Sequence, residues 1–190
     1  MESKVNKNLD KKNIIIKGDF FTLTPFSLEF VTARYLSWLH DKKINKYLAK
    51  AGHETSLSKA KEYCDYLIQS PLDIFLAIVL NENNLHVGNV RLGPMDFDSQ
   101  LCKFSMMIGD SNFHGKGLGT SILELCIDFV FNDLQMNKFY LDVVSENKPA
   151  LRVYEKCGMI EEGFLKNHLR IGENAYDLKI LSLFNKKNQN

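Results

Sequence analysis

The chain has 190 residues, 45% of them hydrophobic and 25% charged, and its formal net charge is +1. A chain of this length can bury a sizeable core within one domain. The near-neutral charge disfavours a protein that coats nucleic acid or an anionic membrane, and the absence of an apolar run of about 18 residues argues against a membrane span.

The cysteines and histidines are spread along the chain without the spacing of a metal site. The four cysteines are typical of reduced, mostly buried thiols: Cys64, Cys102, Cys126 and Cys157. Residues 1–13 are polar and lack the apolar core of a signal peptide. We therefore expect a flexible leader at 1–13, one folded domain at 14–186, no metal and a cytoplasmic location.

The first half of the chain predicts one strand, three helices and three more strands. Residues 20–24 form the first predicted strand, which Pro25 ends. Apolar residues at helical spacing between 27 and 49 predict two short helices, separated at the polar stretch 40–43. Ser56 and Ser58 are candidate caps of a third helix that runs to about residue 69. Apolar runs at 74–80, 85–92 and 101–108 predict an antiparallel meander.

The second half predicts a helix over 121–134, a buried strand over 139–144 and a short helix over 147–156 that Gly158 ends. Two final strands, 159–171 and 174–184, are joined at Gly172-Glu173. The order is β-α-α-α-β-β-β-α-β-α-β-β. This order predicts a single mixed α/β (α+β) domain with a central, mostly antiparallel, twisted sheet flanked by helices.

The most informative segment is His114-Gly115-Lys116-Gly117-Leu118-Gly119-Thr120, between a predicted strand and a helix. Its glycines let the backbone approach a ligand closely, and the amides of a helix start favour an anion such as phosphate. It does not match the dinucleotide fingerprint, because Thr120 stands where a third glycine is required. It does not match the P-loop either, since Gly117 follows Lys116. A glycine-rich helix start without a ligand is the alternative.

A second segment follows the predicted strand at 139–144. Asn147 can cap the next helix, and Pro149 suits its first turn. Ala150 and Tyr154 are four residues apart and share one helix face, so the small alanine leaves room for a ligand beside the tyrosine. An ordinary cap and an aromatic ring packed on the sheet are the alternative interpretation.

Together the two segments resemble the GNAT superfamily of acyl-CoA-dependent N-acetyltransferases. The family's loop pattern, Arg/Gln-x-x-Gly-x-Gly/Ala, corresponds to residues 114–119, with His114 where Arg or Gln is usual. Its second pattern, Asn-x-x-Ala-x-x-x-Tyr-x-x-x-Gly-Phe, corresponds to Asn147, Ala150, Tyr154 and Gly158, with Met159 in place of Phe. The resemblance covers roughly residues 20–184 and implies the GNAT fold.

The resemblance also implies acetyl-CoA as the co-substrate. The loop would hold the pyrophosphate, the preceding strand end would pair with the pantetheine and acetyl carbonyl, and Asn147 would contact the cofactor or a water. The implied cofactor-binding residues are Met107, Ile108, Gly109, His114, Gly115, Lys116, Gly117, Leu118, Gly119, Thr120, Asn147, Ala150 and Tyr154. Tyr154 would also be the catalytic acid, because a phenol with a pKa near ~10 can protonate a departing thiolate.

The acyl acceptor is expected to be an amine, from which a base must remove a proton. Asp142, on the strand before Asn147, matches a position at which some family members carry a carboxylate, and it is the second candidate catalytic residue. A strand residue with purely structural partners is the alternative for Asp142. Asp110, Glu54 and Asp177 are weaker candidates for the base.

Segments 38–48, 87–92 and 176–178 resemble the branch that contains ribosomal-protein N-terminal, spermidine and amino-sugar acetyltransferases. This resemblance implies a small-molecule amine or a protein N-terminus as acceptor, attack in a ternary complex, a monomer or homodimer, and neither nucleic acid nor membrane as partner. Tyr47, His53 and Glu54 are candidate lining residues of the acceptor pocket. A non-catalytic acyl-CoA sensor or partner-binding module is the second function class, and the presence of Tyr154 and Asn147 argues against it.

Overall fold

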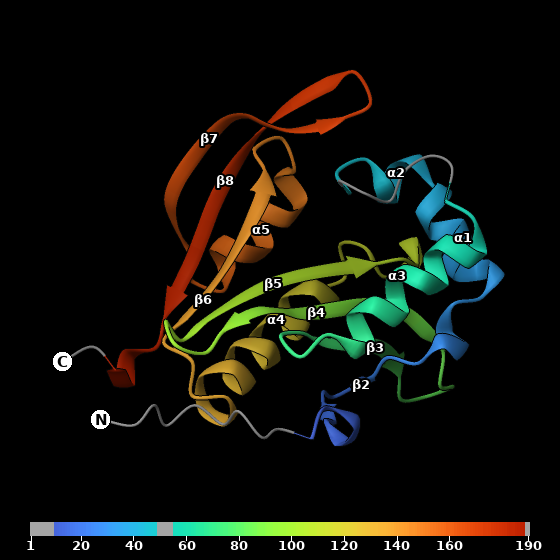
Figure 1. The fold of residues 1–190 in the computed structure, drawn as a ribbon, viewed down its shortest axis with the longest axis horizontal. Coiled ribbons are helices and arrows are strands. Elements are labelled where there is room, and N and C mark those ends of the chain that lie inside the picture. The colour runs from blue at the N-terminus through green and yellow to red at the C-terminus, as the bar shows by residue number, and fades with distance from the viewer. Residues whose placement is uncertain (1–9, 49–54, 189–190) are drawn as a thin grey trace.

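A computed structural model describes residues 10–48 and 55–188 (Figure 1). The helices are α1 (Ala33–His40), α2 (Lys42–Asn45), α3 (Leu57–Gln69), α4 (Leu118–Asp128) and α5 (Lys148–Lys156). The strands are β1 (Ile16–Lys17), β2 (Phe21–Pro25), β3 (Ile74–Leu80), β4 (His86–Asp96), β5 (Leu101–Ile108), β6 (Lys138–Val144), β7 (Ile160–Ile171) and β8 (Asn174–Phe184). Short 3₁₀ turns lie at Lys11–Asn13, Leu28–Phe30, Ser111–Phe113 and Lys186–Asn188.

The eight strands form one sheet in the order β1-β2-β3-β4-β5-β6-β8-β7. Every neighbouring pair is antiparallel except β5 and β6, which are parallel. The predicted fold class and order of elements are therefore confirmed, with the two-residue strand β1 as an addition at the edge of the sheet.

Helices cover the sheet on both faces, which explains why the sequence of strand β3 is apolar throughout. Alternate side chains of a strand point to opposite faces. Ile74, Leu76 and Ile78 of β3 lie in the core under α4 and α5, whereas Phe75, Ala77 and Val79 pack in the core under α1 and α3. A strand covered on both sides has no position for a solvated polar residue, so its hydrophobic run is continuous.

Several element ends differ from the predicted ones. Helix α4 begins at Leu118 rather than Ser121, because Gly117 in the left-handed conformation (φ 86°) starts it earlier, and a π-helical turn, Phe129–Asp133, continues it. Strand β4 continues beyond the predicted end at Leu92, since a register shift lets its pairing with β5 resume at Met95. Pro25 does not end the first strand but pairs with Leu76 as the last residue of β2.

The last residues of the predicted flexible leader are folded. Asp10 caps the turn Lys11–Asn13, and the ammonium of Lys11 donates hydrogen bonds to the carbonyls of Ser70, Pro71 and Asp73. Residues 10–13 are thus attached to the end of α3, which corrects the expectation for this part of the leader. Residues 1–9 lie outside the described chain.

Strands β5 and β6 separate soon after they meet. They are paired at three positions only, the last of which joins Lys103 to Tyr140. From there the remainder of β5 stays with β4 while the remainder of β6 stays with β8, and the two halves of the sheet diverge (Figure 1). Among the strands that the structure describes, none pairs across the opening with the facing edges, 104–108 and 141–144.

A cluster of aromatic rings beneath α1 includes the half-buried imidazole of His86. Its Nε2 atom lies 2.9 Å from both the carbonyl of Gly88 and Oδ1 of Asn89, two acceptors that require a proton on Nε2. The rings of Tyr35 and Trp38 lie 6.2 and 5.1 Å from it, centroid to centroid. Burial lowers the pKa of His86 below its usual 6.5, despite the hydrogen bonds to Asn89 and Gly88, which favour the protonated form.

This lowered pKa predicts a loss of stability in acid. As the pH falls through about 6.5, the unfolded chain takes up a proton at His86 that the folded chain excludes, so the free energy of unfolding decreases. We expect His86→Gln, which keeps a donor but does not titrate, to lose less stability between pH 7.5 and 5.5 than the wild type in urea unfolding. His168→Gln, at an exposed position, is the control and should behave as the wild type; equal losses in all three proteins would contradict the prediction.

Candidate active site

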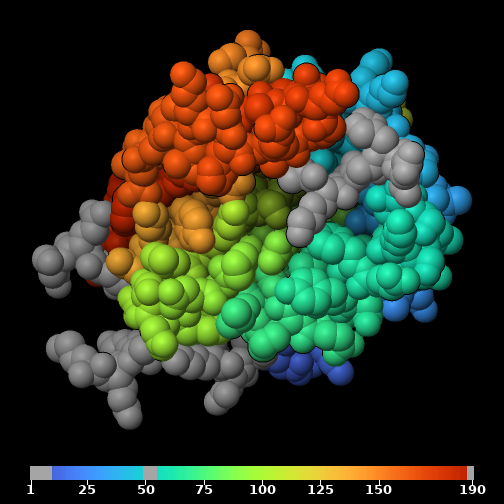
Figure 2. All heavy atoms as spheres, turned by 45° about the horizontal axis from the view of Figure 1, so that its top comes forward, coloured from blue at the N-terminus to red at the C-terminus, as the bar shows by residue number. Residues whose placement is uncertain are grey.

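The opening between β5 and β6 brings the two sequence motifs together. The glycine-containing loop follows the end of β5, and Asn147 follows the end of β6, so both motifs begin where the diverging strands end. Figure 2 shows the surface hollowed between the β7–β8 hairpin, β5 and α3. The candidate site therefore lies at the opening of the sheet.

Of the three predicted residues at the end of β5, Ile108 has its backbone directed away from β4. The amide of Gly109 donates to the carbonyl of Val87 on β4 (2.8 Å), whereas the carbonyl of Ile108 lies 2.8 Å from Nε2 of His114. Because successive strand residues direct their backbone groups to opposite edges, the groups of Met107 and Gly109 face β4. The His114 side chain, which replaces Arg or Gln of the family pattern, thus holds the strand end.

The loop after β5 leaves space for a group to approach its backbone. Gly115 (φ 71°) and Gly117 (φ 86°) are exposed, and a Cβ added to either would meet no atom within 4 Å. Gly117 caps α4 without a side-chain hydrogen bond, so no side chain of the cap itself takes up the first amides of this helix. Lys116 is exposed, whereas Leu118, Gly119 and Thr120 are buried as the first turn of α4. These features fit a pyrophosphate, which needs open space, backbone donors and positive charge.

Helix α5 places the second motif. The Asn147 side chain accepts a hydrogen bond from the Ala150 amide (3.3 Å) and so caps the helix. Ala150 is half-buried, and Tyr154 is 9% exposed. Burial, with a smaller contribution from the charge of Asp142, raises the pKa of Tyr154 to about 12. Within residues 10–48 and 55–188 the Tyr154 hydroxyl makes no hydrogen bond.

The carboxylate of Asp142 forms an ion pair with the ammonium of Lys103. Asp142 is on β6 and Lys103 on β5, so the pair crosses the sheet where the strands begin to separate. Both side chains are about one-third exposed, at 33% and 34%. Sequence reasoning did not identify Lys103, because the register of two distant parallel strands is not visible in the sequence.

The other candidate bases and pocket residues have varied surroundings. Asp110 forms a salt bridge with Arg34 (2.6 Å), and Asp177 accepts a hydrogen bond from the amide of Asn167 (2.7 Å). The ring of Tyr47, which follows α2, contacts the ring of Tyr176 on β8 at a centroid distance of 6.1 Å. The candidates His53 and Glu54 lie outside the described residues.

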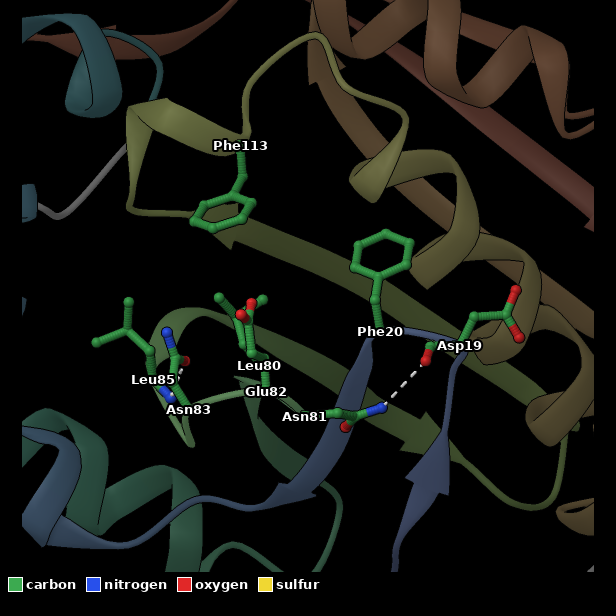
Figure 3. A pocket seen from close by; sticks show the side chains of 8 residues that line it. All are labelled: Asp19, Phe20, Leu80, Asn81, Glu82, Asn83, Leu85 and Phe113. Atoms are coloured by element: carbon green, nitrogen blue, oxygen red, sulfur yellow. Dashed lines mark hydrogen bonds between the residues drawn. The ribbon is translucent and has the colours of Figure 1, made fainter.

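A second hollow, of about 400 Å³, contains none of the predicted site residues (Figure 3). The rings of Phe20 and Phe113 border it, and its other lining residues are Asp19, Leu80, Asn81, Glu82, Asn83 and Leu85. Among the residues that the structure describes, no three His, Cys, Asp or Glu side chains are grouped as metal ligands would be. Neither feature involves the opening between β5 and β6, where the two sequence motifs begin.

The family profile described as the acetyltransferase (GNAT) domain matches residues 21–160. The chain belongs to the GNAT acetyltransferase family. The resemblance that the two sequence motifs showed is thereby confirmed: residues 21–160 form a GNAT acetyltransferase domain.

The names of proteins similar to this GNAT chain specify different acceptors. The spermidine N(1)-acetyltransferase of Vibrio cholerae is 30% identical over 101 residues, which are 53% of this chain and 58% of that protein. The human alpha/beta-tubulin-N-acetyltransferase 9 is 26% identical over 160 residues, covering 76% of this chain and 74% of the human protein. The chain thus aligns with little more than half the length of the first relative.

A solved structure confirms the fold. The crystal structure of spermidine N-acetyltransferase from Vibrio cholerae in complex with CoA and spermine superposes with a TM-score of 0.78 at 23% sequence identity, covering 91% of this chain and all of that one (100%). A microcin C7 self-immunity acetyltransferase in complex with acetyl-CoA and AMP superposes with a TM-score of 0.76 at 21% identity, covering 88% of this chain and 93% of that one. Structures of this fold therefore hold CoA or acetyl-CoA.

The geometry of the glycine loop predicts the effect of a methyl group at Gly117. Gly117→Ala places a side chain in the open space and strains a left-handed position by about 1–2 kcal/mol. Gly172→Ala, in the β7–β8 turn, is a matched control, because Gly172 also has a positive φ (60°) and open space around it. We expect both variants to lower the melting temperature alike, but only Gly117→Ala to weaken acetyl-CoA binding, by about tenfold or more in calorimetry. Equal affinity in the two variants would contradict the assignment of the loop.

Proposed function

We propose that this protein transfers an acetyl group from acetyl-CoA to a primary amine by direct attack within a ternary complex. The observation that carries the proposal is the opening between β5 and β6, where the strand that leads to the glycine loop separates from the strand that leads to α5 and its buried Tyr154. Family membership supports the same chemistry.

Different residues of the chain have different roles in the proposed reaction. Acetyl-CoA supplies the acetyl group and a thiolate as leaving group. In our proposal the loop 114–120 holds the pyrophosphate, the outward-facing backbone of Ile108 orients the acyl end, and Ala150 leaves room beside Tyr154. The Tyr154 hydroxyl gives its proton to the departing sulfur, since a pKa of about 12 keeps the phenol protonated at neutral pH.

We propose Asp142 as the base that takes the proton of the amine, directly or through a water. Its carboxylate is partly exposed at the start of the opening, on the strand that leads to Asn147. Its ion pair with Lys103 is a competing, structural explanation for the same residue. A catalytic base and a purely structural ion pair predict different effects on activity when Asp142 and Lys103 are replaced separately.

For the acceptor, we propose a polyamine, an amino sugar or a protein N-terminus, with a polyamine to be tested first. The spermidine acetyltransferase relative from Vibrio cholerae supports this order. None of the described helices is both long and apolar enough to cross a membrane. A cytoplasmic location and a monomeric or homodimeric state remain predictions from the sequence.

Replacement of Tyr154 tests the proposed function. In an assay of thiol release with spermidine, amino-sugar nucleotides and peptides that begin with Ala or Ser, we expect the wild type to acetylate at least one amine. Tyr154→Phe should lower kcat about 100-fold or more, with the affinity for acetyl-CoA unchanged. Tyr66→Phe, at an exposed position on α3, is the control. With the pKa of Tyr154 at about 12, the hydroxyl stays protonated up to about pH 10, so wild-type kcat should not decline there on its account.

Two results of this experiment would contradict different parts of the proposed function. Binding of acetyl-CoA without turnover of any amine would instead support the non-catalytic sensor. Turnover that is unchanged in Tyr154→Phe would remove Tyr154 from the acid role while leaving the transfer reaction in place.

Separate replacement of the two partners of the ion pair tests Asp142. If Asp142 is the base, Asp142→Asn should lower kcat/KM about tenfold or more across the pH range, whereas Lys103→Met should leave the carboxylate in place and the rate largely intact. If the pair is only structural, both variants should lose the same small amount of stability and retain activity. The measurement is kcat/KM from pH 6 to 9 together with the melting temperature.

A further inference from the structure

The end of β5 is in direct contact with the only tryptophan of the chain. Trp38 is 5% exposed, and its indole lies against the backbone of Gly109. A Cβ at position 109 would stand 2.0 Å from the indole Cδ2 atom, so no other residue fits there without moving the ring. The first residue after β5 is thus covered from the side of helix α1, which lies beside this strand end in Figure 1.

The next residue is held by the same helix. Arg34 forms a salt bridge of 2.6 Å with Oδ2 of Asp110, and the Asp110 side chain is 13% exposed. The other carboxylate oxygen, Oδ1, accepts from the amide of Asn112 (2.9 Å) and caps the turn Ser111–Phe113. This turn leads into the glycine loop, so Asp110 connects α1 to the start of the proposed pyrophosphate site.

One face of α1 carries both contacts. Arg34 and Trp38 are four residues apart and therefore lie on the same side of the helix. The guanidinium carbon of Arg34 is 5.4 Å from the Trp38 ring, within the range of a cation–π contact. Behind the indole, His86 is fixed by its hydrogen bonds to Gly88 and Asn89. The Trp38 ring and the Arg34 guanidinium therefore pack together against the end of β5.

We propose that Arg34 is a positioning residue of the transfer reaction. Through Asp110 and Trp38 it holds the end of β5, so that the outward-facing backbone of Ile108 and the amides of the glycine loop have a fixed separation. This role rests on the proposed function, because both groups are assigned to acetyl-CoA. A displacement of about 1 Å in such groups lowers a reaction rate by up to about 100-fold, although Arg34 itself touches no reactant.

The pair is partly exposed, with side chains at 37% and 13%, so its loss should affect stability little. Arg34→Gln removes the charge, and Asp110→Asn removes the partner charge but keeps an oxygen for the amide of Asn112. We expect each variant to raise the Kd for acetyl-CoA about tenfold and to lower kcat, and the double variant to be no worse than either, since the residues act as one unit. Glu161→Gln, which breaks a comparable surface pair with Lys179 (2.7 Å), is the control and should bind as the wild type.

Trp38 supplies a direct signal, because it is the only tryptophan. We expect acetyl-CoA to change the tryptophan fluorescence of the wild type, and the change to be diminished in Arg34→Gln at saturating acetyl-CoA. Unaltered affinity, kcat and fluorescence response in both single variants would overturn the role of Arg34 while the transfer reaction stands. So would a fall in melting temperature without a change in affinity. A wild type that binds no acetyl-CoA in calorimetry would overturn the proposed function and this inference with it.

Discussion

The early end of pairing between β5 and β6 is the constraint on which the rest of the site depends. A ladder of three positions fixes the relative placement of the two strands, and the loss of the ladder beyond Lys103 and Tyr140 creates two facing backbone edges. Such edges normally invite another strand. In the proposed function, an extended acyl-CoA ligand takes the place of the missing strand.

The two helices that follow the diverging strands begin in different ways. Helix α5 has the side-chain cap of Asn147, whereas α4 starts at Gly117 without one. A cap occupies amides that an anion would need, and its absence leaves the dipole end of α4 to an external partner. The buried Leu118 and Ile122 meanwhile hold α4 on the sheet, so the start of this helix is anchored by packing.

The sequence predicted the element order and both motifs, since each depends on local periodicity, caps and glycines, whereas the meeting of the two motifs at one site was implied by the family resemblance. It did not predict contacts that depend on strand register or on the position of α1. Lys103 beside Asp142 and Trp38 against Gly109 join residues far apart in the chain, and no local pattern marks them. Helix α4 begins three residues before its predicted start, because glycine is a poor helix former and no sequence pattern marks the left-handed cap at Gly117 or the position of Gly119 beside Met106.

The antiparallel connections have a consequence for how the chain folds. Strands β3, β4 and β5 pair with their neighbours in sequence, as do β7 and β8, so these two groups can form from local contacts. The short parallel ladder joins the first group to β6, which pairs in turn with β8, and it requires closure of the long segment that contains α4. Because closing a long segment costs conformational entropy before the ladder forms, we expect the formation of this ladder to be the slow step of folding. The candidate active site is therefore complete only after β5 has paired with β6.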